Sequence, residues 1–146
     1  MAKLDDAIFI DGLVISKFSR ALFEDMARGG ITAANCTCSV WHGFNDTMAN
    51  IAQWNEWFRE HGDLITKIYT ADDIRAAKEA GKVGIILGWQ NTSALGTDIR
   101  NLQIFHELGV RVVQMTYNTQ NLAGSGCWES RDSGLSDFGR HAIEEM

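Results

Sequence analysis

The stretch EAGKVGIILGWQ, residues 79–90, holds the end of one predicted helix and the whole of a predicted strand. Gly81 closes the helical pattern, because glycine readily takes the left-handed conformation that ends a helix. The apolar run after it is typical of a strand buried on both faces. The same order recurs in ARGGITAANCTCSV (27–40) and FHELGVRVVQMTYN (105–118). Short helix-to-strand turns of this kind connect parallel βα units, so the predicted fold class is α/β.

The rest of the chain extends this alternation. Strands are expected at 7–15, 31–40, 83–90 and 110–118, and helices at 23–30, 45–62, 70–81, 98–109 and from 136 onwards. Thr70 with Asp73 three residues later resembles a capping box at the start of one helix. A doubly wound nucleotide-binding sheet would carry a G-x-G-x-x-G motif after its first strand, and this chain has no such motif there. A (β/α)8 barrel needs about 250 residues. Four such units would make half of a TIM-type barrel, so a doubly wound sheet and a half barrel both remain open. The sequence ends inside a predicted helix, which is interpreted as a truncated chain.

Composition narrows the function. The chain has 146 residues, of which 45% are hydrophobic and 22% charged, which suits one globular core. Its formal net charge of -6, without a Lys/Arg-rich run, argues against nucleic acid as a partner. No apolar run approaches the ~18 residues of a membrane-spanning helix, and no signal-peptide pattern opens the chain, so a cytoplasmic location is expected.

Three cysteines, Cys36, Cys38 and Cys127, do not form an even disulfide set. No second Cys/His pair follows the C-x-C at the spacing of a zinc finger. We expect Cys36 and Cys38 to be buried as small apolar side chains.

Four blocks of the sequence resemble the membrane (renal-type) dipeptidase family of metal-dependent hydrolases. They are IDGLVIS (10–16), KVGIILGWQNTSALG (82–96), FHELGVRVVQMTYNTQN (105–121) and DSGLSDFGRHAIEEM (132–146). The resemblance implies a (β/α)8 barrel that cleaves dipeptides with two zinc ions. It also implies that residues 1–146 are the truncated N-terminal half of that single barrel domain, with no second domain. Later strands of the barrel, which supply further ligands, would then lie outside these residues.

The chain departs from the family pattern at the positions that the resemblance assigns to the metal and the substrate. Leu13 and Ile15 stand where the family has His and Asp in D-G-H-x-D, and neither has a lone pair. Gln90 stands where the family has a metal-bridging glutamate, and a neutral amide offers a cation less than a carboxylate does. Tyr117 replaces a substrate-contacting histidine. The metal positions present in this chain therefore do not support zinc.

Polar residues at two predicted strand ends are the candidate site, because barrel enzymes place their chemistry there. Gln90 and Tyr117 are the candidate catalytic residues, and Asn118 is a candidate substrate contact. The alternative for Tyr117 is an ordinary strand residue, since tyrosine is common in strands. Asn91 is expected to cap the following turn.

Three further positions have open interpretations. Arg131 and Asp132 are candidate substrate contacts that clamp a carboxylate, or a surface ion pair. Asp11 orders the first loop or takes part in catalysis, and His42 is an exposed loop residue or a replacement base or single-metal ligand. His61, His106 and His141 are expected to be solvated, and Trp54 and Trp57 to pack a helix on the sheet.

Three functions remain open. The first is a dipeptidase-family hydrolase acting on a dipeptide or related small amide, of which this chain is an N-terminal part with degenerate metal ligands. The second is a metal-free barrel that binds a small molecule or catalyses a different reaction with Tyr117 and Gln90. The third is an inactive fragment, whose open sheet edges favour self-association as a homo-oligomer.

Overall fold

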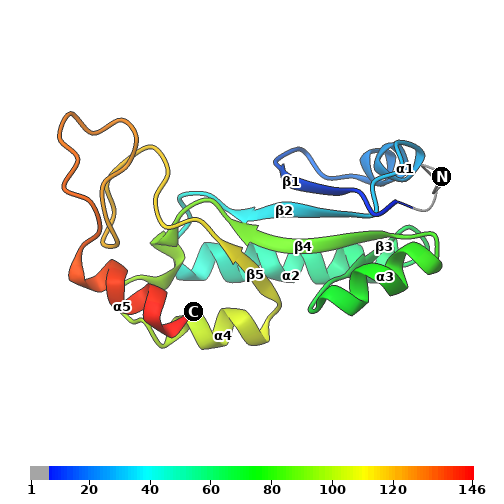
Figure 1. Cartoon of the computed structure of the whole chain (residues 1–146). Coiled ribbons are helices and arrows are strands. Elements are labelled where there is room, and N and C mark those ends of the chain that lie inside the picture. Colours follow the sequence, from blue (N-terminus) through cyan, green and yellow to red (C-terminus); the bar gives the residue numbers. More distant parts are fainter. Residues whose placement is uncertain (1–6) are drawn as a thin grey trace.

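A five-stranded, all-parallel sheet with helices packed against it forms the structure, a computed structural model that describes residues 7–146 (Figure 1). The predicted α/β class is confirmed. The elements in chain order are β1 (Ile10–Val14), α1 (Arg20–Arg28), β2 (Ala33–Ser39), α2 (Phe44–Glu60), β3 (Ile65–Lys67), α3 (Ala71–Glu79), β4 (Val83–Trp89), the 3₁₀ helix η2 (Thr92–Leu95), α4 (Asn101–Glu107), β5 (Val110–Val113) and α5 (Asp137–Glu145).

The sheet is built around β4. Strand β1 pairs with β2, and β2 pairs with β4 along nearly its whole length. The other edge of β4 takes two strands, with β3 against Val83–Ile85 at its start and β5 against Leu87–Trp89 at its end. Strands β1, β2, β4 and β5 therefore follow one another across the sheet in chain order, as successive barrel strands do.

Two predictions about the strands were wrong in detail. Strand β3 was not predicted, because ITK is three residues long and offers no apolar run. The strand expected over 110–118 ends at Val113, although the Gln114 amide still donates to the Trp89 carbonyl at 3.0 Å. Residues 116–118 thus lie in a loop that follows the strand, which frees their side chains from the sheet pattern.

The predicted helix ends are confirmed. Gly30, Gly81 and Gly109 have φ angles of 76°, 64° and 100°, a region that non-glycine residues rarely adopt. At the start of α3, the Thr70 hydroxyl accepts from the Asp73 amide, while the Asp73 carboxylate accepts from the Thr70 amide at 2.8 Å. Both halves of the capping box are present.

Helices α1, α2 and α4 cover one face of the sheet, which we call the outer face (Figure 1). Phe23, Trp54 and Phe105 from these helices pack with Cys36 and other apolar strand residues in one buried cluster. Packing of Trp54 on the sheet is as predicted.

The cysteines on the outer face also behave as expected. Cys36 and Cys38 are buried, and burial raises the pKa of each thiol to about 12. Among the histidines, His106 and His141 are exposed, but the prediction for His61 was wrong. Its side chain is only 16% exposed because its ring lies 5.6 Å from that of Phe23.

Candidate functional site

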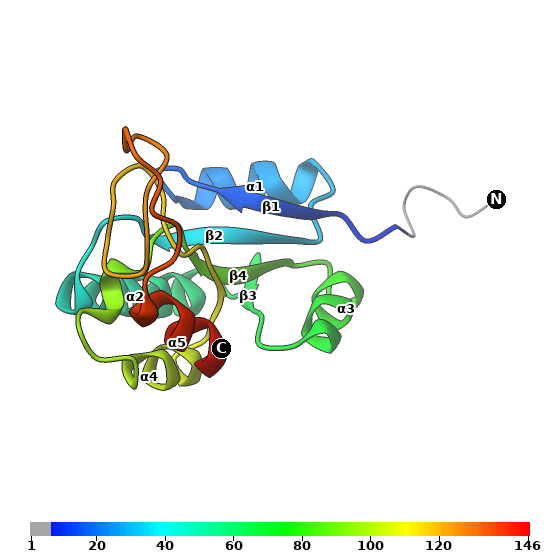
Figure 2. The ribbon, with the colours of Figure 1, turned by 60° about the vertical axis from the view of Figure 1, so that its left-hand side comes forward.

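Strands β1, β2, β4 and β5 end at the same edge of the sheet, and the loops that follow them gather there. The long loop of residues 119–134 rises beyond this carboxyl edge in both views (Figures 1 and 2). The face of the sheet opposite the helices, which we call the inner face, opens towards the same loops. The candidate residues of the sequence therefore belong to one end of the molecule.

Gln90 lies at the end of β4 and is almost fully buried, with 4% of its surface exposed. Its side-chain amide donates to the Thr37 hydroxyl of β2 at 2.9 Å. Thr37 and Gln90 alternate with residues of the outer-face cluster, Cys36 and Trp89, so both belong to the inner face. The bond fixes the Gln90 carboxamide between two neighbouring strands and leaves its carbonyl oxygen as an acceptor.

Tyr117 follows β5, and its ring stacks on that of Trp41, which follows β2. The ring centroids are 6.0 Å apart and the planes differ by 18°. Since β2 and β5 are the two neighbours of the end of β4, the aromatic pair joins the loops on either side of Gln90. Trp41 is 57% exposed, so the pair presents a flat apolar surface at the carboxyl edge.

Asn118 is buried, and its side-chain oxygen has no hydrogen-bond partner among residues 7–146. A buried acceptor without a donor is costly, so this position is unusual among the polar residues of the edge. The backbone here is crowded, because a side chain at Gly126 would meet the Asn118 carbonyl. That carbonyl accepts from the Trp128 amide at 2.8 Å, which ties the long loop to Asn118.

Asn121 connects several segments of this edge by hydrogen bonds, and it was not predicted as a site residue from the sequence. Its amide nitrogen donates to the side chains of Asn91 and Thr92 and to the Met115 carbonyl, at 2.9–3.1 Å. Asn91 in turn caps η2 by accepting from the Ser93 amide at 2.7 Å, as predicted. The residue lies inside the block that carried the family resemblance, but neither its spacing nor its residue type distinguishes it from an ordinary loop asparagine.

Arg131 and Asp132 lie exposed in the long loop. The Asp132 carboxylate accepts from the Gly134 amide at 2.8 Å, and no ion pair joins it to Arg131 in residues 7–146. Asp11 orders the first strand, since its carboxylate accepts from the Leu13 amide at 3.0 Å. His42 is exposed, and its Nδ1 accepts from the Val40 amide at 3.3 Å.

The residues to which the family resemblance assigns metal ligands do not fit a pair of zinc ions. Leu13 and Ile15 are 48% and 62% exposed, and neither hydrocarbon side chain has a lone pair to offer a cation. Gln90 is neutral and already bonded to Thr37. Within the described residues, no group of three or more His, Cys, Asp or Glu side chains is placed to hold a metal ion.

Over residues 7–146, none of the helices combines the length and the apolar character needed to cross a membrane.

Comparison with known proteins identifies the relatives of this chain. In sequence, it is 29% identical over 103 residues to the dipeptidase tcpJ of Claviceps purpurea, covering 69% of this chain and 24% of that protein. In structure, it matches an amidohydrolase from Pseudomonas aeruginosa with a TM-score of 0.95 and 54% identity, covering 97% of this chain and 43% of that one. The probable dipeptidase PvdM from Pseudomonas aeruginosa matches with a TM-score of 0.81 at 19% identity, covering 97% and 44%, and shares the fold.

The chain spans about a quarter of the curated relative and less than half of these two solved structures. The family model of the membrane dipeptidases, peptidase family M19, matches residues 17–146. This match covers every element from α1 to α5, including the carboxyl edge with Gln90, Tyr117 and Asn118. The chain belongs to the membrane dipeptidase family, M19.

Proposed function

We propose that the protein is an amidohydrolase that cleaves a dipeptide or a related small amide bound at the carboxyl edge of the sheet. The observation that carries the proposal is the close match to the solved amidohydrolase, at 54% identity over 97% of this chain. The family match and the polar side chains at the ends of β4 and β5 support the same reaction class. The carboxyl edge of the sheet is where parallel α/β folds bind their substrates.

The residues of this chain have roles in binding and orienting the substrate. Asn118 lies next to Tyr117 at this edge, and its side-chain oxygen, unpartnered within residues 7–146, becomes an acceptor for a substrate N–H group once its side chain turns towards the substrate. Tyr117 has a phenolic O–H that can donate to a carboxylate or carbonyl oxygen, and its ring is held by Trp41. Gln90, fixed by Thr37, offers its carbonyl oxygen to an amide hydrogen. Arg131 is exposed in the loop of residues 119–134, and its guanidinium suits a terminal carboxylate of the substrate.

The proposal includes a change in the metal site. Any zinc that the reaction uses is held by residues other than Leu13, Ile15 and Gln90, because two hydrocarbon side chains and one neutral amide do not hold a dication pair. We therefore expect fewer than two zinc ions per intact polypeptide.

The test is hydrolysis of a panel of dipeptides by the intact gene product, with zinc measured on the same sample by mass spectrometry. We expect turnover with at most one zinc per polypeptide. In Tyr117→Phe, we expect kcat to fall by about 100–1000-fold, the range for loss of one hydrogen-bond donor to the charge that develops in the transition state. Absence of both zinc and hydrolysis across the panel would overturn the proposal.

A second function is favoured by the exposed Leu13 and Ile15, which make the inner face at β1 apolar. The protein would then bind a small molecule without hydrolysing it, and its ligand-induced thermal stabilisation would not change when a chelator is added. The triple variant Leu13→His, Ile15→Asp and Gln90→Glu separates the two. Zinc binding and new activity in that variant would mean that only the ligands differ from those of the relatives.

A further inference from the structure

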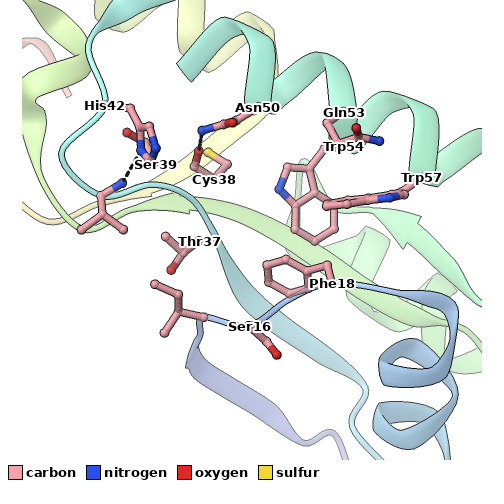
Figure 3. Close-up of a pocket in the computed structure, with 12 residues that line it drawn as sticks. Ser16, Phe18, Thr37, Cys38, Ser39, His42, Asn50, Gln53, Trp54 and Trp57 are labelled. Atoms are coloured by element: carbon pink, nitrogen blue, oxygen red, sulfur yellow. Dashed lines mark hydrogen bonds between the residues drawn. The ribbon is translucent and has the colours of Figure 1, made fainter. Parts of the chain in front are cut away.

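A cavity of about 250 Å³ lies beside the candidate site (Figure 3). It is enclosed by the segment after β1, the end of β2 and one side of α2. Phe18, Trp54 and Trp57 form its apolar wall, and Ser16, Thr37 and His42 lie along the opposite, polar side. None of the elements that carry the candidate catalytic residues Gln90 and Tyr117 contributes to the lining.

The aromatic wall is arranged to receive another ring. The Trp54 and Trp57 rings meet edge to face, with centroids 4.9 Å apart and planes at 88°. The Phe18 ring is tilted by 58° against Trp54, with centroids 4.6 Å apart. Tilted and edge-to-face contacts of this kind are the preferred geometry of aromatic pairs, and a further ring entering the cavity meets both faces and edges.

The size and charge of the cavity limit what it takes. An apolar cavity of about 150 Å³ is sufficient for benzene, whereas sites for whole drug-sized ligands measure roughly 300–1,000 Å³. A volume of about 250 Å³ therefore suits one aromatic side chain rather than a complete substrate. In the described part of the chain, no Asp, Glu, Lys or Arg lines the cavity, so a charged group would find no partner.

Thr37 connects the cavity to the candidate site. The residue lines the cavity, and its hydroxyl accepts from the Gln90 amide at 2.9 Å. A substrate whose amide contacts Gln90 is therefore separated from the cavity by Thr37, and the side chain of that substrate can extend into the cavity. Ile15, a position to which the family resemblance assigns a metal ligand, also lines the cavity and adds to its apolar surface.

We propose that this cavity is a specificity pocket for a neutral aromatic side chain of the substrate. The link to substrate choice rests on the proposed hydrolase function, whereas the binding of a ring does not. The pocket would add a preference that Gln90 alone does not provide, because its lining comes from the segment after β1, the end of β2 with the residues that follow it, and α2.

The experiment uses the intact gene product with indole as the probe, measured by isothermal titration calorimetry. Ser16→Phe fills the mouth of the cavity from an exposed position, and Trp57→Ala removes part of its wall. Trp128→Ala, at a side chain that is 73% exposed and outside the lining, is the matched control. In parallel, kcat/KM is compared for dipeptides with phenylalanine or alanine at either position.

We expect Ser16→Phe to weaken indole binding about tenfold or more, the equivalent of losing roughly one aromatic contact, while Trp128→Ala leaves it unchanged. The melting temperature of Ser16→Phe should match that of the wild type, so that the loss is not due to unfolding. For the hydrolysis, the preference for phenylalanine over alanine should fall by a similar factor in Ser16→Phe.

The two proposals fail in different ways. If Ser16→Phe weakens indole binding but the protein cleaves no dipeptide, the proposed pocket is supported and the proposed hydrolase function is overturned. Dipeptide cleavage without a preference for phenylalanine, together with indole binding that Ser16→Phe and Trp57→Ala leave unchanged, would overturn the pocket and keep the hydrolase.

Discussion

The two faces of the same sheet follow different rules. On the outer face, Cys36, Cys38 and Leu87 are buried under helices and need only to be apolar and of suitable size. On the inner face, Thr37 and Gln90 are joined by a specific hydrogen bond, and Leu13 is exposed. We therefore expect the buried outer face to determine stability, and the polar inner face at Gln90 to contact the substrate, with α2 adding one wall of the proposed pocket. Substitutions on each side should separate these two properties.

The largest difference between buried outer-face residues and the loops should appear in thiol reactivity. Burial raises the pKa of Cys36 and Cys38 to about 12, whereas Cys127 is exposed. At pH 8, their thiolate fraction is on the order of a thousandfold below that of an ordinary thiol with a pKa of about 8.5. A thiol reagent should therefore modify one cysteine per chain quickly and the other two only on unfolding. Rapid loss of three thiols, or of any thiol in Cys127→Ser, would contradict the packing of the outer face.

Trp54→Ala should produce the largest loss of stability. The side chain is 2% exposed at the centre of the aromatic cluster, and its removal leaves a large void. We expect the free energy of unfolding to fall by about 3–5 kcal/mol, measured by urea denaturation. Trp128→Ala deletes the same side chain from the exposed loop and should change stability by less than about 0.5 kcal/mol. Similar losses in both variants would mean that Trp54 is not a core residue.

Gly88→Ala should show how closely the strands meet on the inner face. A Cβ at this position would lie 2.0 Å from the side-chain oxygen of Asn35 on β2. We expect a loss of about 1–3 kcal/mol, the usual range for overpacking, in thermal and urea unfolding.

The double variant Gly88→Ala with Asn35→Ala is the control for that contact. It removes the clashing oxygen but also the Asn35 bond to the Gly12 carbonyl. Its loss of stability should be smaller than the sum of the two single losses, because the two residues interact directly. If the losses of stability are additive, the destabilisation by Gly88→Ala does not come from a clash with the Asn35 side chain.

The same division explains what could be predicted from the sequence. The outer face repeats an apolar pattern that ends on Gly30, Gly81 and Gly109, so the α/β class, the main helices and four of the strands followed from periodicity. Strand β3 did not, because three residues paired with β4 have no pattern of their own.

The site was predicted less completely, because its contacts join distant segments. Gln90 and Tyr117 were placed at strand ends from the pattern and the resemblance, but their partners Thr37 and Trp41 lie more than fifty residues away in the chain. A single sequence carries no signal for such pairs. The same applies to Asn121, because two of its three acceptors, Asn91 and Thr92, lie about thirty residues earlier in the chain.

A smaller effect is expected at the start of α3, which depends on local contacts alone. Thr70→Ala removes the hydroxyl that accepts from the Asp73 amide and should lower stability by about 1 kcal/mol. Thr97→Ala, at an exposed threonine outside a helix start, is the matched control and should be close to neutral. Equal changes in the two variants would mean that the capping box contributes nothing to α3.

The smallest effect concerns the pH dependence of the same cap. Hydrogen bonds from the Tyr69 and Thr70 amides hold the pKa of Asp73 below its usual value. Because the folded-state pKa is lowered, the stabilisation is present above the unfolded-state pKa and is lost as the pH falls through the folded-state value. The wild type should therefore be more stable than Asp73→Asn at pH 7, and the difference should shrink towards pH 2 in urea unfolding. A difference that stays constant from pH 7 to pH 2 would show that the charge of Asp73 does not stabilise α3, because both variants would then differ only in shape.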